Sequence, residues 1–286
     1  MRPVRPEFVP DPDATREAME SMQSDVAAAA TWTDAFGFPV DAVGVSDSLA
    51  PSDADLPLVA GVDQAFLDDR AVSVVVVFRG QTVVDRAYAV TDLVIPYIPG
   101  LLAFREGGPI LSAFAALESD PDLAVFDGSG RIHFRQAGLA THIGVTLGIP
   151  SVGVAKGLLC GTPDEAVDER EEGWRTPIRA GADVDNAAAG TQIGAAFQSR
   201  QYDASQVINP LYVSPGHRVG VGTATDLIER LCTGYKLPEP TREIGVRVAA
   251  GLPRWLTRPT TLESGSRVGP SPTRKHLFVR SRSPII

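Results

Sequence analysis

Residues 58–90 read LVAGVDQAFLDDRAVSVVVVFRGQTVVDRAYAV, and this stretch decides the fold. Its apolar start, Leu58 to Asp63, leads into the run Ala71 to Phe78. After Arg79-Gly80 a third run follows, Thr82 to Val90. β-Branched residues favour extended backbone, and a glycine in a short connection favours a tight turn. The stretch therefore predicts an antiparallel meander of strands.

Helices and strands are expected to alternate after the meander. Apolar residues at helical spacing separate short apolar runs, which is the pattern of βα units. The expected helices are residues 13–30, with Asp13 as the N-cap, 99–117, 134–147 and 222–231. The expected later strands are residues 123–127, 151–155, 192–197 and 211–214. The predicted fold class is α/β.

One domain in residues 1–250 and a tail in residues 251–286 are predicted. The tail carries seven basic residues and one acid, and its Pro, Ser, Thr and Arg content predicts disorder. Polar loops are expected at residues 41–57 and 164–172.

The charge of the chain is unusual. The net charge is -9, so residues 1–250 carry -15 once the +6 of the tail is removed. The chain has 3 lysines and 23 arginines among 26 basic residues. This composition predicts a cytoplasm of very high salt, where the Debye length is about 3 Å at 1 M. Long-range attraction to nucleic acid and long-range repulsion from it would both be weak there.

Compartment and partners are also predicted. The sequence shows no apolar run of the roughly 18–20 residues that cross a bilayer and no signal-peptide start. Cys160 and Cys232 form neither a disulfide framework nor a zinc-binding spacing. We expect a cytoplasmic monomer that does not bind membranes.

A rigid loop precedes the second expected helix. The segment reads Pro96-Tyr97-Ile98-Pro99-Gly100-Leu101-Leu102-Ala103-Phe104-Arg105-Glu106. The prolines fix their own φ and bias the preceding residues toward extended backbone, so Tyr97 is held stiffly. A stiff aromatic beside an acid suits an enzyme that separates stacked bases before it cuts a strand. Alternatively, the loop is a turn whose tyrosine simply packs.

Three carboxylates occupy positions typical of catalytic acids. Asp63 follows an apolar strand start, Asp127 ends the run Leu123 to Phe126, and Glu106 lies early in a helix. Singly, each fits a turn or a solvated surface. Together they form a set of hard oxygen ligands that suits Mg²⁺ or Mn²⁺ rather than Zn²⁺.

Histidines and one lysine add candidates. His133 lies in a Gly-containing turn after Asp127, and His217 could bind a metal, orient water or move a proton. His142 is expected to be structural. Lys156 follows a buried strand and suits a phosphate contact, although a plain surface lysine is the alternative.

Seven segments in this order carry a family resemblance. They are residues 61–63, 96–106, 127–133, 138–144, 153–161, 214–219 and 232–242. Over about residues 13 to 243 the chain resembles endonuclease V, a family that nicks DNA near deaminated purines, chiefly deoxyinosine.

The resemblance implies a ribonuclease-H-like mixed sheet flanked by helices and a Mg²⁺-dependent cut at the second phosphodiester bond 3′ to the lesion. Mn²⁺ is expected to substitute. Implied metal ligands are Asp63, Glu106 and Asp127, with His217 at the same centre and Lys156 at the phosphates. The implied wedge is Tyr97 with Ile98 and Pro99. The implied lesion pocket comprises Gly128, Gly130, His133, Gly138 and Leu159, with Leu102 nearby.

Departures from the family pattern leave alternatives open. Phe134 stands where the family usually has proline, and this change would reshape the pocket.

The alternatives to a deoxyinosine endonuclease are cutting of inosine in RNA, binding of inosine without cutting, and the related nuclease domain of excision-repair proteins. The intact carboxylate set argues against binding without cutting, and the Pro-Tyr-Ile-Pro loop argues against the excision-repair domain.

Overall fold

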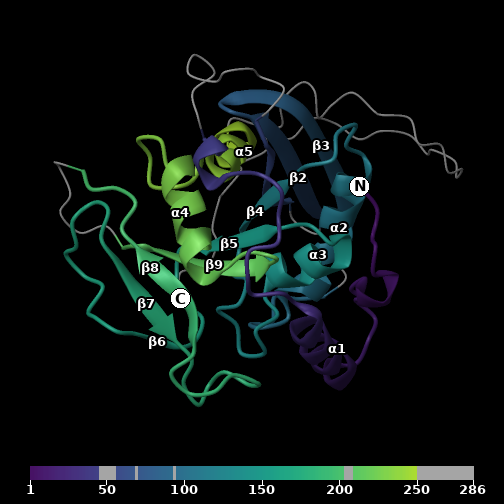
Figure 1. Ribbon diagram of the computed structural model, residues 1–286. Helices are drawn as coiled ribbons and strands as arrows, with labels where there is room; N and C mark the ends of the chain where they lie inside the picture. Colours follow the sequence, from purple (N-terminus) through teal and green to yellow (C-terminus); the bar gives the residue numbers. More distant parts are fainter. Residues whose placement is uncertain (45–55, 68–69, 93–94, 203–208, 250–286) are drawn as a thin grey trace, which may run out of the picture.

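The computed structural model describes residues 1–44, 56–67, 70–92, 95–202 and 209–249. Within these residues lies a nine-stranded sheet in the order β3-β2-β1-β4-β5-β9-β8-β7-β6 (Figure 1). The β1–β4 and β4–β5 pairs are parallel, and the other pairs are antiparallel. The predicted α/β class, a mixed sheet flanked by helices, is confirmed.

The predicted meander forms one half of the sheet. It comprises β1 (Leu58–Leu67), β2 (Arg70–Arg79) and β3 (Thr82–Asp92), paired antiparallel. Residues 71–78 of β2 are buried throughout, because α2 packs on one face of the strand and α5 on the other. A strand covered on both faces needs apolar residues at every position, which explains the unbroken valine run.

The other half begins with short parallel strands. β4 (Leu123–Asp127) and β5 (Ser151–Ala155) are joined through α3 (Leu139–Leu147). An antiparallel extension follows: β6 (Thr162–Pro163), β7 (Arg175–Arg179), β8 (Gln192–Phe197) and β9 (Leu211–His217).

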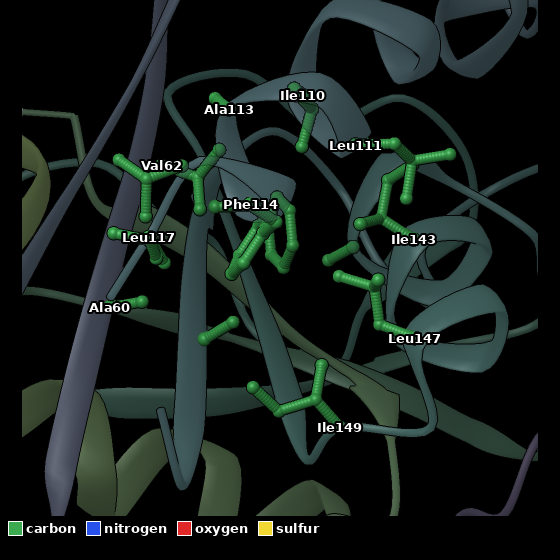
Figure 2. Packing of buried hydrophobic residues seen from close by; sticks show 14 of the residues in the cluster. Ala60, Val62, Ile110, Leu111, Ala113, Phe114, Leu117, Ile143, Leu147 and Ile149 are labelled. Carbon is green, nitrogen blue, oxygen red and sulfur yellow. The ribbon is translucent and has the colours of Figure 1, made fainter. Parts of the chain in front are cut away.

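Helices cover both faces of the sheet (Figure 1). On one face α2 (Leu102–Ala115) packs with α3, and Phe114 lies among the side chains shown in Figure 2. On the other face lie α4 (Val221–Leu231) and α5 (Glu239–Ala249). α1 (Arg16–Ala29) packs against α3. Burying a side chain such as Phe114 contributes about 1.5–3 kcal/mol. The short 3-10 turns are Pro6–Phe8 and Val40–Ala42.

Several predicted boundaries are wrong. The N-cap of α1 is Thr15, whose Oγ1 accepts a hydrogen bond from the Ala18 N–H at 3.3 Å, and not Asp13. The helix predicted to begin at residue 134 begins at Leu139, because Gln136 has a φ of 55° that no α-helix accommodates. α2 begins at Leu102 rather than at residue 99.

Three elements were not predicted, namely β6, β7 and α5. Residues 45–55 of the expected polar connection and the tail 251–286 lie outside the described residues, so the domain boundary near 250 stays a prediction. Among the helices that the structure describes, none combines the length and apolar character needed to cross a membrane.

Candidate active site

Three carboxylates meet where β1 and β4 end. Val62 pairs with Phe126 in the parallel register, so Asp63 and Asp127 occupy the next position of each strand. Glu106 comes from the second turn of α2. With Lys156 they line a cavity of about 370 Å³, which we call the carboxylate hollow. The structure therefore brings these predicted residues together.

Hydrogen bonds fix this group. The Asp63 Oδ1 accepts from the Gln64 N–H at 2.7 Å, and the Gln64 side-chain amide donates to the Glu106 carbonyl at 3.1 Å. Gln64 therefore ties β1 to α2 beside the acids. The Lys156 Nζ donates to the Asp127 Oδ2 at 2.8 Å. Gln64 was not predicted as a site residue; its position directly after Asp63 was the available signal.

Burial makes ionisation of two of the acids unfavourable. Burial, and then the charge of Asp127, raises the pKa of Asp63 to about 7. Burial raises the pKa of Glu106 to about 8, with Arg105 opposing and the two aspartates adding to the shift. A buried carboxylate needs a compensating positive charge, and bringing a cation to the hollow would supply it.

The donor set fits a hard divalent cation. Asp63, Glu106 and Asp127 offer only carboxylate oxygens, which Mg²⁺ and Mn²⁺ prefer. In the described part of the chain, no three His, Cys, Asp or Glu side chains converge closely enough to enclose an ion as they stand. The ammonium group of Lys156 instead contacts Asp127.

Lys156 has a second lysine near it. Burial alone would lower the pKa of Lys156. The negative charges of Asp127 and then of Asp63 have the larger combined effect, so the pKa of the lysine is raised. Burial, and then the charge of Lys156, lowers the pKa of Lys236. Of these two lysines, Lys156 lines the carboxylate hollow.

A second cavity of about 360 Å³ adjoins the first, and we call it the glycine-lined hollow. Its walls include seven predicted residues: Tyr97, Pro99, Leu102, Gly128, His133, Gly138 and Leu159. Phe134 also lines it. Tyr97, Leu102 and Gly128 line both hollows, so they form a shared wall. The tyrosine is 48% exposed, which leaves its ring accessible.

One predicted pocket residue, Gly130, and one predicted wedge residue, Ile98, do not line the glycine-lined hollow. A Cβ on Gly130 would meet the Pro215 carbonyl, and the Gly130 N–H donates to the Ser214 Oγ at 2.9 Å. Gly130 therefore allows two backbones to approach closely and does not line the hollow. Ile98 packs against the buried cluster of Met19, Leu101 and Phe104. The roles of Gly130 in the lesion pocket and of Ile98 in the wedge stay predictions beside these packing contacts.

The Pro-Tyr-Ile-Pro loop is anchored through the Gly100 carbonyl. This oxygen accepts from the Gln23 side-chain amide at 2.7 Å and lies 3.0 Å from the His133 Nε2. The His133 Nδ1 accepts from the Arg135 N–H at 3.1 Å, so Nε2 carries the proton and donates to Gly100. Burial lowers the pKa of His133 to about 4.

His133 therefore holds the loop as a neutral imidazole. Gln23 was not predicted as a site residue. Its signal was a polar residue in the buried stripe of α1, between Met19 and Val26.

His217 does not join the carboxylates. It pairs with Ser151 at the start of β5, whereas Asp127 pairs with Val154 near the end of that strand. Its Nδ1 accepts from the Thr31 N–H at 3.2 Å, and burial lowers its pKa to about 4. The prediction that His217 is a metal ligand is therefore corrected, because β9 runs antiparallel and carries the residue to the opposite edge. His142, with its Nε2 2.8 Å from the Phe8 carbonyl, is structural as expected.

Comparisons with known proteins agree on one family. The family model described as Endonuclease V matches residues 44–244. Endonuclease V of the halophilic archaeon Haloarcula marismortui is 56% identical over 255 residues, covering 85% of this chain and 94% of that protein.

Solved structures agree in fold. Endonuclease V from Streptomyces avermitilis superposes with a TM-score of 0.68 at 31% identity, covering 89% of this chain and 98% of that one. Ciona intestinalis endonuclease V, in complex with a 23mer DNA containing an inosine followed by a ribo-adenosine, has a TM-score of 0.60 at 22% identity. It covers 82% of this chain and 96% of that one.

Proposed function

Because the chain belongs to the endonuclease V family, we propose that it is a DNA repair endonuclease that nicks the second phosphodiester bond 3′ to deoxyinosine by Mg²⁺-dependent hydrolysis. The observation that carries the proposal is the shared wall of the two hollows. Tyr97 lines the carboxylate hollow and the glycine-lined hollow at once, so a residue that could separate bases lies beside acids that could hold a cation.

The glycine-lined hollow suits an extruded purine. A cavity of about 360 Å³ falls in the size range of small-molecule sites. Hypoxanthine pairs weakly, so taking it out of the stack costs less than extruding a normal base. Tyr97 would fill the space that the base leaves, on a loop fixed by its prolines and by the hydrogen bonds to Gly100.

Asp63, Glu106 and Asp127 would hold the metal. When bound, a divalent cation lowers the pKa of the attacking water and neutralises charge on the phosphate. The Lys156 Nζ lies 2.8 Å from the Asp127 carboxylate. It would leave this carboxylate and contact a phosphate oxygen of the substrate instead. Glu106 would give up its proton as the cation arrives, since burial holds its pKa near 8.

The substrate is carried over from the family. In support, the Ciona intestinalis protein was solved with inosine-containing DNA. Inosine-containing RNA is the alternative substrate, and binding without cutting is the alternative activity.

A nicking assay tests the proposal. Labelled duplexes with one central deoxyinosine, matched undamaged duplexes and inosine-containing RNA would be incubated in Mg²⁺, in Mn²⁺ and in EDTA across a wide salt range. We expect cutting only of the deoxyinosine strand, only with metal, at the second bond on the 3′ side. Cutting of RNA alone would reassign the substrate. Retained inosine binding without any cut would favour the binding-only alternative.

A further inference from the structure

Four aromatic side chains are exposed in the described part of the chain. They are Phe66, Tyr97, Tyr202 and Tyr235, with exposed fractions of 41%, 48%, 41% and 50%. Exposed aromatics that gather on one surface mark a binding region. Of these four residues, only Tyr97 has a role predicted from the sequence.

Strand pairing places Phe66 on the edge that carries the carboxylates, and the segment that leads to Tyr202 leaves β8 at the same edge. Phe66 lies three residues beyond Asp63 on β1 and lines the carboxylate hollow. On the other side, Ala155 at the end of β5 pairs with β9, and the start of β9 pairs with Phe197 at the end of β8. Tyr202 follows five residues after Phe197.

Tyr235 reaches the same edge from the connection between α4 and α5. The Ser199 Oγ, two residues beyond the end of β8, donates to the Lys236 carbonyl at 2.6 Å. Tyr235, the neighbour of Lys236, therefore lies on the side of the sheet where β5 and β8 end.

An arginine lies over each of three rings. The guanidinium carbons of Arg105, Arg200 and Arg242 lie 4.6, 5.8 and 4.0 Å from the ring centroids of Phe66, Tyr202 and Tyr235. A cation over one face orients an aromatic ring. The exposed part of each ring is then available to a planar partner such as a nucleobase.

Two of these three arginines are already paired with acids. Arg200 is paired with Glu172 at 3.2 Å and Arg242 with Glu239 at 2.6 Å. Lys156 is paired with Asp127 at 2.8 Å. On a chain of net charge -9, stacking is a better source of affinity at this edge than phosphate attraction.

We propose that Phe66, Tyr202 and Tyr235, together with Tyr97, form a stacking track that binds unpaired bases on both sides of the carboxylate hollow. The inference rests on the proposed function and deepens it, because it names the form of the substrate. The strand is held single-stranded over several nucleotides, and the binding depends weakly on salt.

The test is an equilibrium binding measurement with a labelled single-stranded oligodeoxynucleotide that contains one deoxyinosine. Asp127→Asn serves as the parent protein, so that the strand is not cut in Mg²⁺. Tyr202→Ala and Tyr235→Ala are each expected to weaken binding about 5- to 150-fold, the range for loss of one stacked base. Tyr202→Phe and Tyr235→Phe are expected to bind like the parent. Melting temperatures establish that all variants fold.

Trp32→Ala is the matched control. The guanidinium carbon of Arg131 lies 4.8 Å from the centroid of the Trp32 ring. Arg131 also donates to the Gln192 carbonyl at the start of β8, so Trp32 lies near the edge opposite to the proposed track. We expect parental affinity for this variant. If the parent binds and the tyrosine variants bind equally well, the track is overturned while the proposed function stands. An affinity for the oligodeoxynucleotide that falls with salt as steeply as that of a phosphate-binding protein would also overturn the stacking track. If the parent binds no deoxyinosine strand at all, the proposed function fails first.

Discussion

Gln23 donates its side-chain amide to the backbone carbonyl of Gly100 at 2.7 Å, across 77 positions of sequence. The hydrogen bond joins α1 to the loop that carries Tyr97. α1 precedes residues 44–244, which the family model matches. A helix outside the matched region therefore helps to fix the loop that separates the two hollows.

Gln23→Leu removes this anchor with little change in shape. It also removes the hydrogen bond that the Gln23 Oε1 accepts from the Arg135 side chain at 3.3 Å, and loss of the two bonds is expected to cost about 1–3 kcal/mol of unfolding free energy. The Tyr97 loop would be held less firmly, so binding of deoxyinosine duplex is expected to weaken several-fold more than folding alone explains. Denaturant unfolding and binding titrations measure the two effects. Val26→Ala, on the same buried face of α1 but packed with Ala137 and Val145 rather than with the loop, is the control, and equal affinities for both variants would reject the anchoring role.

Tyr97→Ala is expected to weaken binding of deoxyinosine duplex and leave stability nearly unchanged. The side chain is 48% exposed and so contributes little to the core. Removing one base-stacking aromatic costs about 1–3 kcal/mol of binding free energy. Val84→Ala, a change at an exposed residue of the edge strand β3, should have no effect on binding. Unchanged affinity of Tyr97→Ala for inosine duplexes would exclude a wedge.

The metal-free protein is expected to lose stability as the pH rises from 6.5 to 8. Burial raises the folded-state pKa of Asp63 to about 7 and of Glu106 to about 8. In this window the unfolded chain has already released both protons, whereas the folded protein still binds part of them. Raising the pH therefore disfavours the folded state, by at most about 1.4 kcal/mol per pH unit for each group.

Thermal melts in EDTA and in Mg²⁺ measure this dependence. Glu106→Gln should flatten the slope in EDTA, and Mg²⁺ should stabilise the protein more at pH 8 than at pH 6.5. The buried histidines add a slope of opposite sign near pH 6.5, because the pKa of His133, His142 and His217 is about 4 in the folded protein and about 6.5 in the unfolded chain. Glu106→Gln shares this contribution, so its difference from the unaltered protein isolates Glu106. A slope that Glu106→Gln leaves unchanged would show that Glu106 is already ionised.

Much of the fold follows from local pattern. The valine run of β2 and the apolar runs of β4 and β5 predicted strands, because burial on both faces requires apolar residues. α5 was missed because the segment EPTREIGVRVA carries few apolar residues. Its position is set by tertiary packing: a Cβ on Gly61 of β1 would overlap the Pro240 backbone, so only glycine admits the helix.

Part of the site was also predictable from local sequence pattern. Asp63 and Asp127 follow apolar strand runs, and parallel neighbours bring such positions together. The place of His217 depends instead on the antiparallel direction of β9, which no local pattern encodes. The role of Gly130 likewise depends on a contact with Pro215, distant in sequence.

A chain that ends at Ala250 tests the predicted domain boundary. The catalytic domain is expected to fold without residues 251–286, so the melting temperature should stay within a few degrees of the full chain. Calorimetry of both proteins measures this. A large drop in melting temperature would show that the tail packs on the domain.

The most direct test of the active-site assignment compares Asp127→Asn with His217→Gln in single-turnover nicking of a deoxyinosine duplex in Mg²⁺. Asp127 lines the carboxylate hollow, whereas His217 lies at the opposite edge of the sheet. Losing a metal ligand removes several kcal/mol of transition-state stabilisation, so Asp127→Asn should cut at least about 100-fold more slowly while still binding the duplex. His217→Gln should cut at nearly the rate of the unaltered protein. Full activity of Asp127→Asn would contradict the assignment.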